Sequence, residues 1–206
     1  MTLQEQLQTY KNDPSHQLPL VAQDLLDGHI KALKAKSDDY GLIPGAKAPD
    51  FTFDASTSGG HLYKHLEDGP VVLTFIRGNW CTYCNLQLKA YEAMMPEITA
   101  AGAKLFIVTM QAEDKDHEHL TLIKDKDGVI AKLYKVLYPI EKGLAHVYKD
   151  LHVNLSLENS DGQWHLPLTA TYIIDQKALI RHTFIDADYK NRMEPESILA
   201  ILNIIS

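Results

Sequence analysis

A strand-like segment that leads directly into two closely spaced cysteines constrains this sequence more than any other feature. Residues 71–76 are apolar, β-branched or aromatic, which is typical of a strand buried inside a sheet. Residues 85–95 include strong helix formers with apolar side chains at helical spacing. Cys81 and Cys84, the only two cysteines of the chain, therefore lie where a buried strand gives way to a helix.

This position predicts a thiol redox site. The free backbone N–H groups and the positive dipole at a helix N-terminus favour a thiolate, so we expect the pKa of Cys81 to be lowered. Cys84 follows about one helical turn later, close enough for the two sulfurs to form a disulfide without unwinding the helix. Cys84 should be more shielded from solvent and less acidic than Cys81.

Two other interpretations of the cysteine pair are less favourable. A structural zinc site needs four ligands, and the chain contains no second pair of cysteines. His61 and His65 are the nearest additional ligands, but the apolar segment separates them from the cysteines. Buried cysteines without a redox role are common, yet Trp80 and Tyr83 beside the pair favour a functional loop. We therefore expect no metal and no bound cofactor.

Composition and charge are those of an ordinary soluble globular protein. The 206 residues are 45% hydrophobic and 23% charged, enough for one large domain or a domain with extensions. The net charge of −7 disfavours nucleic acid as a partner, because nucleic acid requires a basic face. No apolar run approaches the length of a membrane span, and no secretory signal is apparent. Two cysteines at redox spacing suit a reducing cytosol, so we expect a cytoplasmic protein.

The spacing of apolar residues predicts an α/β protein. Helices are predicted over residues 2–10, 19–37, 85–95 (with a kink at Pro96), 131–137, 140–152 and 195–205, and a helical turn over 61–66. Strands are predicted over residues 48–53, 70–76, 103–110, 171–174 and 179–185, and polar or charged segments over 113–119 and 154–163. This alternation predicts three layers. We expect an N-terminal helical extension over residues 1–40 and a main domain over residues 41–206.

Several ordered motifs carry a resemblance to a known family. They are Gly45-Ala-Lys-Ala-Pro-Asp-Phe51-Thr52, Phe75-Ile-Arg-Gly-Asn-Trp-Cys81-Thr-Tyr-Cys84-Asn85, Asp125-Lys-Asp-Gly-Val-Ile-Ala-Lys-Leu-Tyr134, Leu166-Pro-Leu-Thr-Ala-Thr-Tyr-Ile-Ile-Asp175 and Phe184-Ile-Asp-Ala-Asp-Tyr189. Together they resemble the peroxiredoxin-like (alkyl hydroperoxide reductase/thiol-specific antioxidant) family of the thioredoxin-like superfamily. The resemblance implies a thioredoxin-like fold, with a central mixed sheet flanked by helices.

The resemblance also implies an activity. In a peroxiredoxin-like enzyme, Cys81 would attack a peroxide to give a sulfenic acid, and Cys84 would condense with it to a disulfide. An external dithiol such as thioredoxin, or a glutathione-linked system, would then reduce the disulfide. A homodimer is a further expectation.

The sequence departs from the family at two catalytic positions. Gly78 stands where typical peroxiredoxins have a threonine three residues before the peroxidatic cysteine, and Thr169 stands where they supply an arginine. We expect Arg77 to replace that arginine in stabilising charge on the leaving oxygen. Hydroxyl groups could donate further hydrogen bonds, and the candidates are Thr82, Thr169 and Thr171. Trp80 should pack beside the sulfur, and Tyr83 should face solvent, where it could touch a partner.

Two other functions remain open at this point. In a thioredoxin-like disulfide reductase, Cys81 would attack a protein or small disulfide and Cys84 would resolve the mixed disulfide. In a redox-responsive binding protein, the oxidation state of the pair would select the partner. Turnover of a peroxide, of a disulfide, or of neither separates the three.

Overall fold

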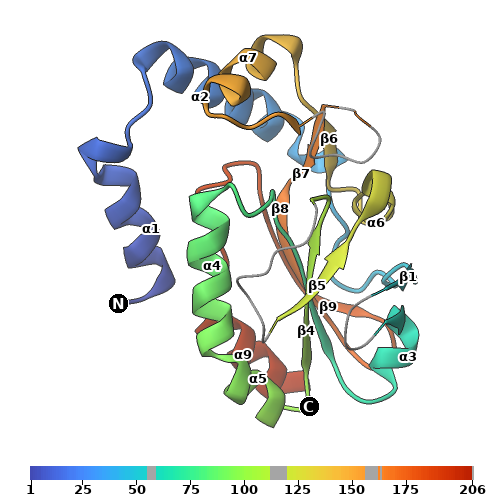
Figure 1. The fold of residues 1–206 in the computed structure, drawn as a ribbon. Helices are drawn as coiled ribbons and strands as arrows, with labels where there is room; N and C mark the ends of the chain where they lie inside the picture. The colour runs from blue at the N-terminus through green and yellow to red at the C-terminus, as the bar shows by residue number, and fades with distance from the viewer. Residues whose placement is uncertain (55–58, 112–119, 156–161, 163, 206) are drawn as a thin grey trace.

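The structure, a computed structural model, describes residues 1–54, 59–111, 120–155, 162 and 164–205. The charged segment predicted at 113–119 and most of the polar loop predicted at 154–163 lie outside these residues. Figure 1 shows a central sheet with helices packed on both of its faces. This is the three-layer α/β arrangement that the sequence predicts.

The central sheet has five strands in the order β5-β4-β3-β8-β9. They are β3 (Val71–Phe75), β4 (Lys104–Thr109), β5 (Thr121–Lys124), β8 (Thr169–Ile174) and β9 (Ile180–Asp186). β4 runs parallel to both β3 and β5, whereas β8 runs antiparallel to both β3 and β9. The sheet is therefore mixed, as the sequence predicts. Every residue of β3 is buried, because helices cover both faces of the sheet.

The two faces of the sheet belong to separate parts of the core. Val72 and Ile76 pack on one face, whereas Leu73 and Phe75 pack on the other, as expected for alternating side chains. The first face is covered by α1 (Leu3–Asn12), α4 (Thr82–Ala93), α5 (Met95–Ala100) and α9 (Pro195–Ile205). The core on the second face includes residues of α3 (Leu62–Leu66) and α6 (Val129–Leu133). It also includes residues of α2 (Leu20–Lys34) and α7 (Lys142–Asp150), which lie beyond one end of the sheet (Figure 1). Both cysteines therefore lie on the first face, with α4.

Two N-terminal helices precede the first strand. α1 begins with a capping box, in which the side chains of Thr2 and Glu5 each accept a hydrogen bond from the other residue's N–H. It packs against α4, and α2 packs against α7 (Figure 1). The N–H groups of Leu3 and Gln4 also donate to the Glu194 carboxylate at 3.1 and 2.5 Å. α1 is thus attached to the segment that leads into α9. Within the described ranges, every helix is too short or too polar to span a bilayer.

Several short elements differ from the sequence prediction. The sequence misses β5, which has only four residues at the sheet edge, and the antiparallel pair β6 (Leu137–Pro139) and β7 (His165–Pro167). The helix predicted at 131–137 ends at Leu133, because Lys135 adopts a positive φ of 55° and the chain turns into β6. The strand predicted at 48–53 contributes only β1 (Thr52–Phe53), which pairs with β2 (Gly60–His61).

The kink predicted at Pro96 is a break between two helices. α4 ends at Ala93, and α5 begins at Met95 with Pro96 in its first turn, where the missing N–H leaves no helical hydrogen bond unmade. The other predicted helices and strands are confirmed to within a few residues. Short 3-10 helices at Pro14–His16, Ser37–Asp39 and Lys126–Gly128 complete the described elements.

Candidate active site

The two cysteines lie at the junction of β3 and α4, as predicted. Cys81 is the N-cap of α4, and its carbonyl oxygen accepts hydrogen bonds from the N–H groups of Cys84 and Asn85 at 2.8 and 3.1 Å. Both thiols are free, and their exposed fractions are 3% for Cys81 and 0% for Cys84. Among the described residues, neither belongs to a group of three or more potential metal ligands. The pair is therefore a buried dithiol in this structure.

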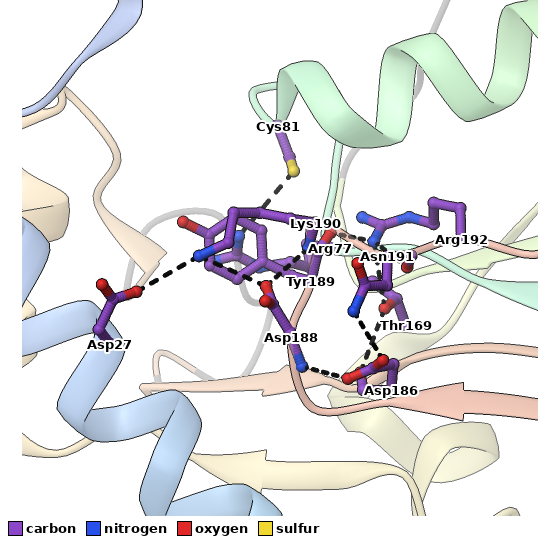
Figure 2. Close-up of polar contacts among 10 residues, drawn as sticks. All are labelled: Asp27, Arg77, Cys81, Thr169, Asp186, Asp188, Tyr189, Lys190, Asn191 and Arg192. Atoms are coloured by element: carbon purple, nitrogen blue, oxygen red, sulfur yellow. Dashed lines mark hydrogen bonds and ion pairs between the residues drawn. The ribbon is translucent and has the colours of Figure 1, made fainter. Parts of the chain in front are cut away.

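Arg77 reaches the first of these sulfurs from the end of β3. Its Nη1 lies 3.9 Å from Cys81 Sγ (Figure 2). Its Nη2 donates to the Tyr148 hydroxyl at 2.5 Å. The guanidinium carbon lies 4.0 Å from the ring centre of Tyr189 and 4.8 Å from that of Trp80. Cation–π contacts of this kind offset part of the cost of burying the charge. The structure thus places the Arg77 guanidinium beside the Cys81 sulfur, and it places the Trp80 ring against that guanidinium.

A second arginine, Arg192, reaches the other sulfur, and the sequence analysis misses it. Its Nη2 donates to Cys84 Sγ at 3.5 Å, and its exposed fraction is 4%. Its Nη1 donates to the Thr169 hydroxyl at 3.3 Å, to the Asn191 carbonyl at 2.8 Å and to the Tyr189 carbonyl. The Thr169 hydroxyl cannot supply the positive charge of the arginine that the family has at this position. It instead accepts a hydrogen bond from Arg192, which lies in the segment before α9 (Figure 2).

The two sulfurs differ in acidity because of these contacts. Burial raises the pKa of Cys84, but the hydrogen bond from Cys81 and the charge of Arg192 outweigh it and hold that pKa well below the usual thiol range. The same hydrogen bond, together with burial, raises the pKa of Cys81. The pair thus loses its first proton readily and its second with difficulty. The directions of the two pKa shifts are opposite to the order of acidity expected from the sequence.

The reason for the reversal lies in the local geometry. The Cys81 side chain makes no capping hydrogen bond to the first turn of α4, so the helix N-terminus gives its sulfur little specific stabilisation. Arg192 approaches Cys84 more closely than Arg77 approaches Cys81. A nearby full charge therefore outweighs the partial charge of the helix.

Thr171 belongs to a buried hydrogen-bond network beside the site. Its hydroxyl lies 3.2 Å from the Thr74 hydroxyl and 3.5 Å from the Tyr91 hydroxyl, deep in the core. Tyr91 in turn donates to the carbonyl of Met193 at 3.0 Å. The predicted candidate thus contacts neither sulfur in this structure, but it belongs to a network that fixes the residue next to Arg192.

Tyr83 is partly buried against the N-terminal helix, whereas the sequence predicts that it faces solvent. Its ring packs edge-on against Tyr10 of α1 at 5.2 Å and against Tyr189 at 5.7 Å between ring centres. Burial is the main cause that raises the pKa of Tyr83. The neighbouring candidate, Thr82, accepts a hydrogen bond from the Tyr10 hydroxyl at 3.3 Å. α1 therefore covers the loop between the two cysteines.

This cover predicts a measurable effect on thiol access. Tyr10→Ala removes a hydrogen bond and an aromatic pair, together about 1–2 kcal/mol, from the closed arrangement. If alkylation requires local opening, iodoacetamide should modify the reduced thiols about 5- to 30-fold faster. Tyr63→Ala is the control. Tyr63 lies on α3, on the other side of the sheet from the cysteines, and its hydroxyl donates a comparable hydrogen bond to the Ala48 carbonyl at 2.7 Å. Equal acceleration in both variants would show general destabilisation instead.

The family of the chain follows from a comparison with protein-family models. The model described as "AhpC/TSA family" matches residues 44–183, well over half of the sequence. The chain belongs to the AhpC/TSA family. This membership, together with two neighbouring free thiols, supports thiol-dependent reduction of peroxides, an oxidoreductase activity. It also confirms the family resemblance of the sequence motifs.

Solved structures of peroxiredoxins share the fold. Peroxidoxin BcpB from Mycobacterium tuberculosis is 17% identical with a TM-score of 0.56, covering 80% of this chain and 99% of its own. Peroxiredoxin Q from Xanthomonas campestris is 16% identical with a TM-score of 0.58, covering 79% and 98%. A yeast mitochondrial 1-Cys peroxiredoxin, described as resolved via glutathione/thioredoxin systems, is 16% identical with a TM-score of 0.58, covering 79% and 75%. A search of curated proteins gave no match.

Proposed function

We propose that this protein reduces a hydroperoxide with Cys81 as the attacking thiol and Cys84 as the resolving thiol. The observation that carries the proposal is a buried dithiol in which each sulfur has its own guanidinium, Arg77 at 3.9 Å and Arg192 at 3.5 Å. A peroxidase must stabilise negative charge on sulfur before the reaction and on oxygen during it. Two fixed cations beside two sulfurs suit both requirements.

Access favours Cys81 as the residue that meets the peroxide. It lies at the start of α4 and retains 3% exposure, whereas Cys84 lies one turn deeper at 0%. In the reduced pair the lower pKa belongs to Cys84, and after the first ionisation the two neighbouring sulfurs share one proton. Transfer of the shared proton from Cys81 to Cys84 leaves the charge on Cys81, next to Arg77. The attacking thiolate thus forms without release of a proton to solvent.

The first half-reaction then balances as follows. Cys81 thiolate attacks the terminal oxygen of ROOH, the O–O bond breaks, and the products are Cys81 sulfenic acid and RO⁻. Arg77 stabilises the charge on the departing oxygen. This oxygen takes up the proton that Cys84 had received, directly or through solvent, which gives ROH and returns Cys84 to a thiolate. In the second half-reaction Cys84 thiolate attacks the sulfenic sulfur and expels hydroxide, which takes a proton from solvent to form water. The sulfurs are oxidised to a disulfide, and the peroxide is reduced to an alcohol and water.

An external dithiol would complete the cycle by reducing the Cys81–Cys84 disulfide. Thioredoxin or a glutathione-linked system is the proposed reductant, in line with the systems in the description of the yeast structure. A reducing compartment such as the cytoplasm would supply either one. Both sulfurs are buried and α1 contacts the half-buried loop between them, which makes a protein disulfide a poorer competitor than a small peroxide.

Stopped-flow mixing of the reduced protein with hydrogen peroxide and with a small alkyl peroxide tests the proposal. One transition-state donor typically contributes about 100- to 1000-fold, so oxidation should be at least about 100-fold faster than for a free thiolate. Thiol counting should then fall from two free thiols to none, and non-reducing electrophoresis should show a monomer. A peroxide rate no better than a free thiolate, with rapid reaction of a small disulfide, would favour the reductase. Reaction with neither would favour a redox-responsive binding protein.

A further inference from the structure

The two arginines of the site come from different parts of the chain and contact different sulfurs. Arg77 follows β3 and contacts Cys81, whereas Arg192 precedes α9 and contacts Cys84. The proposed reaction also has two halves, each with one attacking thiolate and one departing oxygen. A single cation could serve both halves only if both sulfurs lay against it. Here each sulfur is contacted by a different guanidinium, although the charges of both arginines lower the pKa of both thiols.

We propose that Arg192 is the catalytic residue of the second half-reaction, in which it stabilises Cys84 thiolate as that thiolate attacks the Cys81 sulfenic acid. This inference rests on the proposed peroxidase function and assigns Arg77 to the first half-reaction. In the second half-reaction the S–O bond of the sulfenic acid breaks, the S–S bond forms, and hydroxide leaves to become water. No further oxidant or reductant is needed, because the oxidising equivalent is already on Cys81.

The surroundings of Arg192 hold its guanidinium in place for this role. Its Nη1 is engaged by the Thr169 hydroxyl and by two backbone carbonyls, which leaves Nη2 directed at Cys84 Sγ. The next residue, Met193, is fixed through its carbonyl by Tyr91. Asn191 on the other side donates to the Asp186 carboxylate at 2.8 Å (Figure 2). A donor held this firmly loses little energy to reorganisation when charge develops beside it.

Burial makes the second half-reaction depend on this cation. Cys84 has no exposed surface, and an apolar environment disfavours a thiolate. Once Cys81 has become a sulfenic acid, it no longer has the thiol proton that lowers the pKa of Cys84 in the reduced pair. Arg192 is then the cation in contact with Cys84. Without it, the resolving thiolate would be scarce, and the sulfenic acid would persist.

A long-lived sulfenic acid has a second chemical consequence. A further peroxide can oxidise it to a sulfinic acid, which a dithiol does not reduce. The ratio of disulfide to sulfinic acid therefore reports the rate of the second half-reaction. By this reasoning Arg192 also limits overoxidation of Cys81.

Single-turnover kinetics of Arg192→Met provides the test. We expect disulfide formation to slow by about 3- to 30-fold, because Cys84 thiolate becomes scarcer while its higher nucleophilicity offsets part of the loss. Peroxide consumption should slow by less, since Arg192 only assists the first ionisation of the pair and Arg77 remains beside Cys81. A 1,3-dione should trap the accumulated sulfenic acid, and mass spectrometry should find more sulfinic acid at Cys81. Disulfide formation should also shift to higher pH, because Cys84 has lost the charge that lowers its pKa. Arg192→Lys should restore part of the rate.

Two further variants separate this role from a structural one. Thr169→Val keeps the guanidinium but removes the hydroxyl that holds it at 3.3 Å, so disulfide formation should slow by about 2- to 10-fold. Arg181→Met is the control. Arg181 is an exposed arginine on β9 that forms an ion pair with Asp175 at 3.4 Å, so its substitution should change the rate of neither half-reaction. Thr169→Val also tests the proposal if Arg192→Met fails to fold.

Three results would overturn the inference. Slower peroxide consumption with unchanged disulfide formation in Arg192→Met would assign Arg192 to the first half-reaction. Equal slowing of both steps, with no shift in pH, would indicate a structural role. A wild-type protein that consumes no peroxide would reject the proposed function itself, and that result is visible before any variant is made.

Discussion

Cys81→Ser is expected to abolish peroxide consumption, whereas Cys84→Ser, given one equivalent of peroxide, should consume it and stop at the sulfenic acid. The serine hydroxyl at position 81 is far too weakly acidic to form the attacking anion at neutral pH. In Cys84→Ser the Cys81 thiol remains beside Arg77, so the first half-reaction can proceed. The sulfenic acid then has no thiol partner, because the chain contains no other cysteine.

The measurement is peroxide consumed per chain, with mass spectrometry of the product after trapping by a 1,3-dione. Wild type with an excess of dithiol should turn over many times and serves as the reference. The opposite pattern, with Cys81→Ser consuming one peroxide and Cys84→Ser none, would exchange the two roles. That alternative has a physical basis, since the lower pKa in the reduced pair belongs to Cys84. The two variants therefore decide between access and acidity as the property that selects the nucleophile.

Local sequence was sufficient to predict the part of the site that is local in the chain. Cys81, Cys84 and Arg77 lie within eight consecutive residues, at a junction whose strand and helix are both strongly patterned. The end of a buried strand and the first turn of a helix restrict where these side chains can point. The family motifs add the central mixed sheet, since they mark β3, β8 and β9 in order.

The second half of the site could not be predicted in this way. Arg192 is 108 positions from Cys84 in the chain, and its contact depends on how the segment after β9 packs over the sheet. The adjacent motif ending at Tyr189 is recognisable in the sequence, but Arg77 is the replacement that the sequence predicts for the arginine missing at Thr169. A guanidinium can reach one point from several backbone positions. A motif comparison that reads one position at a time does not detect such a replacement.

Tyr83 was mispredicted for a related reason. A loop between the two cysteines of a bare thioredoxin-like domain would face solvent, but α1 places Tyr10 against this one. The periodicity of residues 2–10 predicts a helix and gives no information about which surface it covers. The docking of α1 depends instead on Glu194, which accepts hydrogen bonds from Leu3 and Gln4. The residues in these contacts are about 190 positions apart in the chain, and no local sequence pattern links them, so the docking of α1 cannot be predicted from periodicity.

Arg77→Met is expected to reduce the rate of the reaction with peroxide by about 30- to 1000-fold, a loss of about 2–4 kcal/mol of transition-state stabilisation. Acidity of the thiol cannot replace this contribution. For a generic thiol, lowering the pKa from about 8.5 to about 6.5 gains about 25-fold in thiolate at neutral pH. The accompanying fall in nucleophilicity returns about 8-fold of that gain, so the net advantage is only about threefold. A fast peroxidase therefore requires a cation placed at the departing oxygen.

Two comparisons make the Arg77→Met result specific. Exchange with a small disulfide develops charge on sulfur rather than oxygen, so it should change far less than the reaction with peroxide. Tyr148→Phe removes the hydroxyl that Arg77 Nη2 contacts at 2.5 Å but keeps the guanidinium, so the loss should be only about fivefold. An Arg77→Met variant that keeps its peroxide rate within about threefold would reject Arg77 as the group that stabilises the departing oxygen. Arg192 would then be the remaining cation in contact with the cysteine pair, and a single guanidinium would have to serve both half-reactions.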